Sequence, residues 1–137
     1  MPEWDGYARR GDSSEAGPVA GVRRRGIPEG AVVLVFDMGY VHWFFGSCVL
    51  GRNPVASEGG GVLNLPDLGR VLSTSHVELR GPDGAGRVWV EDKGTVSGTW
   101  LAHDGVETRL EPWRPVEACF GDMVRLGGYR FQIDRAG

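Results

Sequence analysis

The stretch HVELRGPDGAGRVWVED, residues 76–92, holds two short β-type runs separated by a strong turn signal. In the first run, Val77 and Leu79 alternate with charged residues, so apolar and charged side chains would lie on opposite faces of a strand. The sequence Gly-Pro-Asp-Gly at 81–84 then marks a turn, and the run RVWVED at 87–92 alternates again. This stretch therefore predicts two strands joined by a turn.

Similar short runs recur along most of the chain, with turns about every 8–12 residues. No segment shows an amphipathic helix of about a dozen residues. We expect strands at 31–36, 40–45, 48–50, 62–65, 76–80, 87–92, 99–101, 106–110, 123–126 and 129–133. The pattern predicts an all-β fold, a two-sheet antiparallel β-sandwich over residues 30–137.

Composition agrees with this fold class and excludes several functions. The chain has 137 residues, of which 41% are hydrophobic, and its 23 glycines and 8 prolines favour many turns. A formal charge of −3 argues against a nucleic-acid binder, and no apolar run has the form of a signal peptide or membrane span. Cys48 and Cys119 lack CxxC spacing, which predicts neither a zinc site nor a disulfide framework. We expect a cytoplasmic protein without cofactor or metal.

Residues 1–29 differ from the rest of the chain in composition and in hydrophobic pattern. They are rich in Gly, Ser, Pro and charge, and they show no strand or helix period. The cluster Arg23–Arg25 could contact RNA, lipid or an acidic partner, but three arginines are weak evidence and a solvated linker is the better interpretation. We predict a flexible N-terminal tail at 1–29 followed by the sandwich.

Four segments at expected strand ends carry hydroxyl, basic, acidic or imidazole groups, three of them together with glycine: Gly51-Arg52, Ser73-Thr74-Ser75-His76, the run 94–99 and the run 121–127. A sandwich gathers its loops at one end, so the first three could converge on one ligand. Their order and spacing resemble the forkhead-associated (FHA) domain, a family that reads phosphothreonine peptides. A phosphate needs an arginine fork, hydroxyl donors and free backbone N–H groups, and these loops offer all three.

The resemblance implies a set of site residues. Those expected to bind the phosphopeptide are Arg52, Ser73, Thr74, Val96 and Ser97. Those expected to support the site are Gly51, His76, Gly98 and Thr99. Arg52 would contact the phosphate or the adjacent peptide backbone, Ser73 would donate its hydroxyl, and Val96 would line the pocket for the threonine methyl. His76 would hold the Ser73 turn through hydrogen bonds to loop backbone.

Alternatives stay open at three of these positions. Ser73 could instead be a turn or strand-cap serine whose hydroxyl bonds its own backbone. Arg52 could instead be a surface arginine paired with Glu58 or Asp67. Ser97 stands where the family usually has an asparagine that grips the peptide main chain. A serine has one short hydroxyl and could simply form the turn.

A catalytic interpretation is weaker than a binding one. Ser73, His76 and Asp92 could suggest a triad, but a serine three residues before a histidine across a turn does not lie correctly on it. His42 and His103 have no partners at metal-ligand spacing in the sequence and are expected to be exposed or edge residues. We therefore expect no enzyme.

The function expected from the resemblance is phosphorylation-dependent protein–protein interaction in signalling. The partner would be a phosphothreonine-containing protein, either a kinase substrate or the kinase itself, and the domain would be a monomer that binds neither nucleic acid nor membrane. The alternative is a phosphorylation-independent FHA-like scaffold with a degenerate site, which would assemble through a sheet face or the loop around Trp113.

Overall fold

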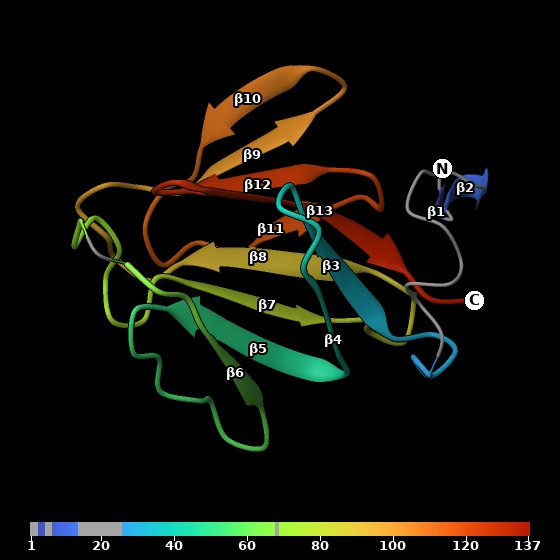
Figure 1. Ribbon diagram of the computed structural model, residues 1–137, viewed down its shortest axis with the longest axis horizontal. Helices are drawn as coiled ribbons and strands as arrows, with labels where there is room; N and C mark the ends of the chain where they lie inside the picture. The colour runs from blue at the N-terminus through green and yellow to red at the C-terminus, as the bar shows by residue number, and fades with distance from the viewer. Residues whose placement is uncertain (1–2, 5–6, 14–25, 68) are drawn as a thin grey trace.

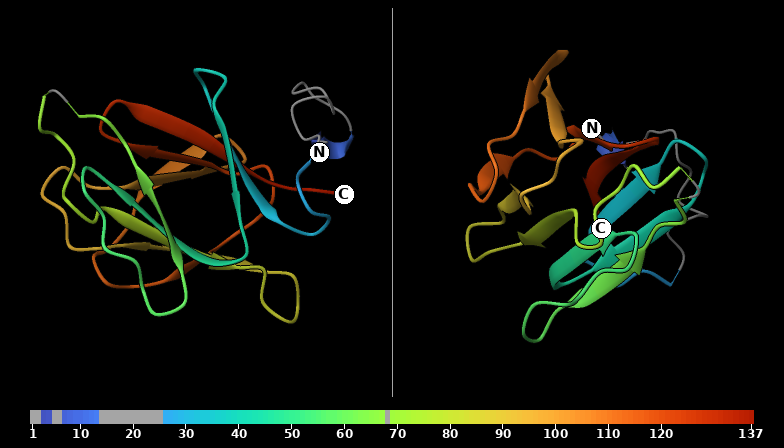
Figure 2. Two further views of the ribbon diagram at one scale, coloured as in Figure 1. Left: turned by 60° about the horizontal axis from the view of Figure 1, so that its bottom comes forward. Right: turned by 90° about the vertical axis from the view of Figure 1, so that its left-hand side faces the viewer.

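The computed structural model describes residues 3–4, 7–13, 26–67 and 69–137 of the chain. Its strands are β1 Glu3–Trp4, β2 Tyr7–Ser13, β3 Val32–Phe36, β4 Val41–Phe44, β5 Gly46–Gly51, β6 Gly61–Asn64, β7 Val77–Gly81, β8 Val88–Asp92, β9 Trp100–His103, β10 Val106–Arg109, β11 Val116–Ala118, β12 Met123–Leu126 and β13 Tyr129–Arg135. Two sheets pack face to face, as Figures 1 and 2 show. The predicted all-β two-sheet sandwich is confirmed.

The first sheet has the order β10-β9-β12-β13-β3-β4, and the second has the order β11-β8-β7-β5-β6. Neighbouring strands are antiparallel with one exception, the parallel pair β5–β6, in which Leu50 lies opposite Leu63. The chain between these strands crosses from one end of the sheet to the other through the glycine-rich loop 52–60. This pair differs from the antiparallel arrangement that we predicted.

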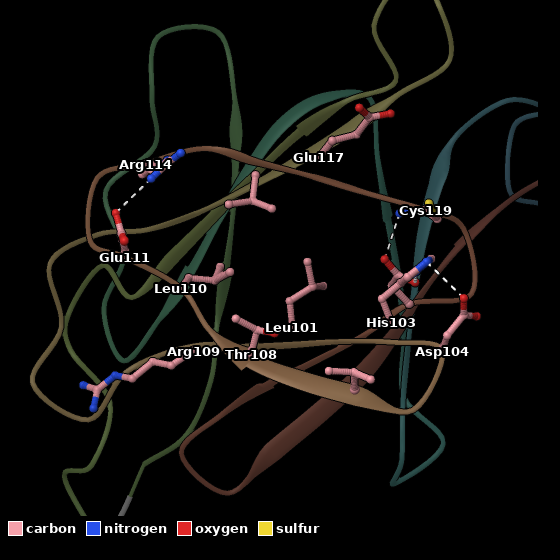
Figure 3. A pocket seen from close by; sticks show the side chains of 13 residues that line it. Leu101, His103, Asp104, Thr108, Arg109, Leu110, Glu111, Arg114, Glu117 and Cys119 are labelled. Carbon is pink, nitrogen blue, oxygen red and sulfur yellow. Dashed lines mark hydrogen bonds and ion pairs between the residues drawn. The ribbon is translucent and has the colours of Figure 1, made fainter.

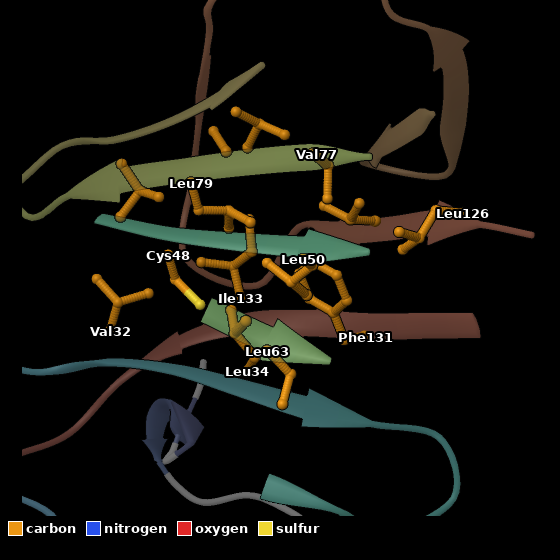
Figure 4. Close-up of a cluster of buried hydrophobic side chains, with 14 of the residues drawn as sticks. Val32, Leu34, Cys48, Leu50, Leu63, Val77, Leu79, Leu126, Phe131 and Ile133 are labelled. Carbon is orange, nitrogen blue, oxygen red and sulfur yellow. The ribbon is translucent and has the colours of Figure 1, made fainter. Parts of the chain in front are cut away.

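The core lies between the sheets and follows the alternation of the strands. Val77 and Leu79 of β7 point inward and are fully buried, as are Phe131 and Ile133 of β13 on the facing sheet (Figure 4). Burying side chains of this size contributes about 1.5–3 kcal/mol each. This core holds the strand ends, and therefore the loops, at fixed positions.

Glu78 corrects one detail of the predicted pattern. It lies on the face opposite Val77 and Leu79, as the alternation predicts, yet it is only 1% exposed. The Ser57 hydroxyl donates to Glu78 Oε2 at 2.7 Å, and Lys93 Nζ donates to Oε1 at 3.0 Å. Burial alone would raise the pKa of Glu78, but these hydrogen bonds, with help from the Arg80 charge, leave it below its ordinary value.

The two ends of the sandwich domain lie together. Gly30 N donates to Ala136 O at 2.8 Å, and Ala136 N donates to Ala31 O at 3.0 Å. This end is opposite to the loops that follow β5 and β8 (Figure 1). No helix among the described residues is long and apolar enough to cross a bilayer.

The N-terminal part of the chain leaves the tail prediction untested. β1 and β2 pair antiparallel, with Glu3 opposite Ala8 and Trp4 opposite Tyr7. Residues 1–2, 5–6 and 14–25, on which most of the tail prediction falls, lie outside the described residues.

Candidate functional site

Three loops meet at one end of the sandwich. They are the segment after β5, the β6–β7 loop and the β8–β9 loop. The first two are joined through their backbones: Arg52 N donates to Ser73 O at 3.0 Å, and Asn53 N donates to Thr74 O at 3.1 Å. The β5–β7 pairing therefore continues past the strands and fixes Arg52 beside Ser73 and Thr74.

Gly51 is required by this close approach. A Cβ atom placed on it would lie 2.2 Å from Thr74 O and 2.9 Å from Ser73 O, far inside van der Waals contact. Any side chain at this position would push the 73–74 backbone away from β5. The glycine thus brings the expected phosphate-binding groups to their observed spacing.

His76 connects the second loop to the third. It is fully buried, and its Nδ1 accepts a hydrogen bond from Ser73 N at 3.1 Å. Its Nε2 lies 2.9 Å from Gly98 O and must donate to that carbonyl, which assigns a neutral ring with the proton on Nε2. Both ring nitrogens bond backbone groups, so neither is free to activate the Ser73 hydroxyl. The geometry excludes the triad and gives His76 a positioning role.

Asp92 organises the β8–β9 loop, a role that the sequence analysis missed. Its Oδ2 accepts from Gly94 N and Thr95 N, each at 3.0 Å. Its Oδ1 accepts from the hydroxyls of Thr95 at 2.7 Å and Thr99 at 2.6 Å. Burial raises the pKa of Asp92, but these hydrogen bonds outweigh it and hold the pKa below its ordinary value. An aspartate at a strand end with threonines three and seven residues later is the signal that could have revealed this role.

Ser97 and Val96 lie on the tip of that loop. The Ser97 hydroxyl donates to Val71 O at 2.8 Å and so ties the third loop to the second. Val96 is 95% exposed. Arg109, which the sequence analysis did not select, donates from Nη2 to Val96 O at 3.1 Å and braces the loop from β10.

The Arg52 guanidinium has N–H donors that bind no acceptor in the described residues. Its Nε lies 3.4 Å from Leu72 O, and no carboxylate among the described residues lies within 4.0 Å of it. The alternative pairing with Glu58 or Asp67 is therefore wrong. Asp67 instead accepts from Leu72 N at 2.6 Å. The guanidinium remains a half-buried cation without an anionic partner in the described part of the chain.

The hydroxyls of Ser73 and Thr74 complete the site. Ser73 is half-buried and Thr74 is exposed, and within the described residues neither hydroxyl has a protein partner. The structure thus brings Arg52, Ser73 and Thr74 together on one platform. Gly51, His76, Gly98 and Thr99 hold that platform in shape through the contacts above.

Neither a protein-family model nor a curated protein sequence matches this chain. Solved FHA domains do match its fold across most of its length. One, from an analysis of phosphothreonine-dependent FHA domain interactions, is 22% identical and covers 78% of this chain and 98% of its own, with a TM-score of 0.57. The FHA domain of human APLF, in complex with an XRCC1 bisphospho peptide, is 19% identical over 77% of this chain and 98% of its own, with a TM-score of 0.60.

The FHA domain of an Arabidopsis thaliana hypothetical protein is 21% identical and covers 90% of this chain and 96% of its own, with a TM-score of 0.59. At these identities the likeness establishes the fold. The chain has the FHA fold. The resemblance that the loop motifs indicated is thereby confirmed at the level of the fold.

Proposed function

We propose that this domain binds phosphothreonine-containing peptides and mediates phosphorylation-dependent protein–protein interaction. The observation that carries the proposal is the platform of Arg52, Ser73 and Thr74. Their side-chain donors have no protein acceptors in the described residues, apart from the long contact of Arg52 Nε. Unpaired donors held in a fixed arrangement are what an incoming anion requires.

The chemistry of the platform fits a phosphate monoester. Such a group carries a charge of about −1.5 to −2 and three strong acceptor oxygens. Arg52 would supply the charge-assisted contact, and the two hydroxyls would donate to the remaining oxygens. The preformed geometry lowers the ordering cost on binding, because His76 and Asp92 already hold the loops.

Two features bear on peptide specificity. Val96 presents an exposed apolar side chain at the loop tip, and a threonine methyl packed against it would favour phosphothreonine over phosphoserine. Ser97, whose hydroxyl is engaged with Val71 O, offers less grip on the peptide main chain than an amide would. We infer phosphate recognition with weak recognition of the peptide backbone. The partner is a kinase substrate or the kinase itself, and no catalytic group, cofactor or metal takes part.

An oriented phosphothreonine peptide library, followed by calorimetry on the selected peptide, tests the proposal. Arg52→Ala should weaken binding at least about ten-fold, since a hydrogen bond to a charged group contributes about 1.5–3 kcal/mol. Arg87→Ala is the matched control, because it removes the same charge from the 81–87 turn, where Arg87 pairs with Asp83. The unphosphorylated peptide should not bind. Equal affinity of parent and Arg52→Ala for the phosphopeptide would contradict the assignment.

The engaged hydroxyl of Ser97 also supports a second candidate, a phosphorylation-independent scaffold that uses exposed side chains such as Val96 and Trp113. Phosphatase treatment of a captured partner separates the two. A phosphopeptide reader releases its partner, whereas a scaffold retains it.

A further inference from the structure

The structure brings together three potential metal ligands that are distant in sequence. The ligand atoms of His103, Cys119 and Asp122 all lie within 4.8 Å of one another. His103 is the last residue of β9, so the group lies away from the β8–β9 loop that precedes that strand. It borders a cavity of about 830 Å³ (Figure 3). The spacing of the sequence had argued against such a group.

Cys119 and Asp122 are presented by one tight turn. Asp122 N donates to Cys119 O at 3.0 Å, and Cys119 N donates to Asp122 Oδ2 at 2.9 Å. These two bonds fix the carboxylate, leaving Oδ1 directed away from the turn and toward the imidazole of His103, 2.7 Å from its Nδ1. The Asp122 carboxylate is thus oriented before any ion arrives, and the backbone of Cys119 is held beside it.

Asp104 supplies the outer contact that metal-binding histidines usually have. Its Oδ2 lies 3.3 Å from His103 Nε2, on the opposite side of the ring from Asp122. In the ion-free protein, Nδ1 donates to Asp122 Oδ1 at 2.7 Å. Once an ion replaces that proton, a proton on Nε2 would be held by Asp104, and the Nδ1 lone pair would face the ion. Histidine ligands commonly donate their second N–H to a carboxylate in this way, which fixes the tautomer and the ring orientation.

We propose that His103 Nδ1, Cys119 Sγ and Asp122 Oδ1 bind a divalent cation of the zinc type. The mixed nitrogen, sulfur and oxygen donor set suits Zn²⁺, which prefers tetrahedral sites with ligand distances of about 2.0–2.3 Å. Binding requires the His103 and Asp122 side chains to separate by a few tenths of an ångström. The proton that His103 Nδ1 donates to Asp122 Oδ1 in the ion-free protein and the proton of the Cys119 thiol are both released to solvent. Because His103 and Cys119 are exposed, the ion has a direct path to the site.

The cavity leaves the fourth coordination position accessible. Its apolar lining includes Leu101, Leu110 and Val116, and the three ligands lie at its edge. A water molecule can therefore complete the coordination from the cavity side. The ion would connect the end of β9 to the β11–β12 turn. This site is separate from the phosphopeptide platform and does not depend on the proposed function.

Cobalt is the probe that tests the site, because a Co²⁺–thiolate bond gives a charge-transfer absorption that carboxylates and imidazole alone do not. The reduced full chain, freed of metal by chelation, is titrated with Co²⁺ and then with Zn²⁺. We expect one Co²⁺ per chain with thiolate absorption, and displacement by Zn²⁺. Cys119→Ser should abolish the absorption, and His103→Ala should weaken binding at least ten-fold. Cys48→Ser, the matched control, should change neither, because Cys48 is buried beside His42.

Alkylation of the parent chain gives a readout that needs no variant. Saturating Zn²⁺ should slow the modification of Cys119 at least ten-fold, measured by peptide mapping. The proposal is overturned if no thiolate absorption appears, if Cys119→Ser retains it, if Cys48→Ser loses it, or if Zn²⁺ leaves the alkylation rate of Cys119 unchanged. In those cases His103 and Asp122 form only an ion pair that closes the turn.

Discussion

Replacing His76 with alanine should destabilise the domain and weaken phosphopeptide binding together. The ring is fully buried and satisfies two backbone groups, Ser73 N–H and Gly98 C=O, at 3.1 and 2.9 Å. Each buried polar group left unpaired costs about 1–3 kcal/mol. Since Ser73 is only half-buried, water can reach part of this region, and we expect a total loss of about 2–4 kcal/mol.

The assay is thermal and urea unfolding of parent, His76→Ala and His76→Gln. For a domain of this size, 1 kcal/mol corresponds to roughly 4 °C, so His76→Ala should lower Tm by about 8–16 °C. Glutamine has one acceptor and one donor at similar reach, so His76→Gln should recover part of the loss. An unchanged Tm for His76→Ala, or a glutamine variant no more stable than the alanine variant, would refute the reasoning that these two hydrogen bonds align the loops.

Three further changes test other parts of the site. Gly51→Ala should cost about 1–3 kcal/mol in urea unfolding and weaken phosphopeptide binding, because its Cβ meets the 73–74 backbone. Gly84→Ala, which meets nothing within 4 Å, should do neither. Ser97→Asn should raise affinity for the phosphopeptide about three- to thirty-fold in calorimetry by adding one or two neutral hydrogen bonds, and no gain would favour the scaffold. Finally, Asp92 and Glu78 have lowered pKa values, so their stabilisation is complete above their ordinary pKa values and is lost as pH falls below about 4. Asp92→Asn should lower the urea midpoint at neutral pH and make that midpoint less sensitive to acid. If the midpoint of the variant falls as steeply between pH 6 and pH 3 as that of the parent, Asp92 does not cause the acid sensitivity.

Strands with clear alternation could be predicted from the sequence, and strands without it could not. Met123–Leu126 was expected and is observed with the same bounds, because its alternation is bordered by glycine turns. β11 was missed because it has only three residues and follows Pro115, where the local sequence resembles a loop. The parallel β5–β6 pair was missed because the intervening glycine-rich loop gives no indication of the direction in which the chain returns.

Some contacts of the site could likewise be predicted from the sequence, and others could not. Motif order was enough to predict that Arg52 and Ser73 lie together, because the ends of strands in a sandwich share an edge. The role of Asp92 was missed because its partners come after it, in a loop whose conformation it determines. The grouping of His103 with Cys119 and Asp122 was missed because metal-ligand spacing rules concern residues near in sequence, whereas strand packing determines this contact.

The pairing of Ala31 with Ala136 has a practical consequence. Both ends of the sandwich domain emerge side by side, on the end opposite to the Arg52 platform. A purification tag, a fluorescent protein or a linker to a sensor chip attached at either end would therefore leave the loops open to solution. Immobilising the domain through its C-terminus should preserve peptide binding, whereas coupling through Lys93, the first residue of the β8–β9 loop, would crowd the loops. Because its two ends are adjacent, the domain could also be inserted into a surface loop of another protein, with the Arg52 platform facing solvent.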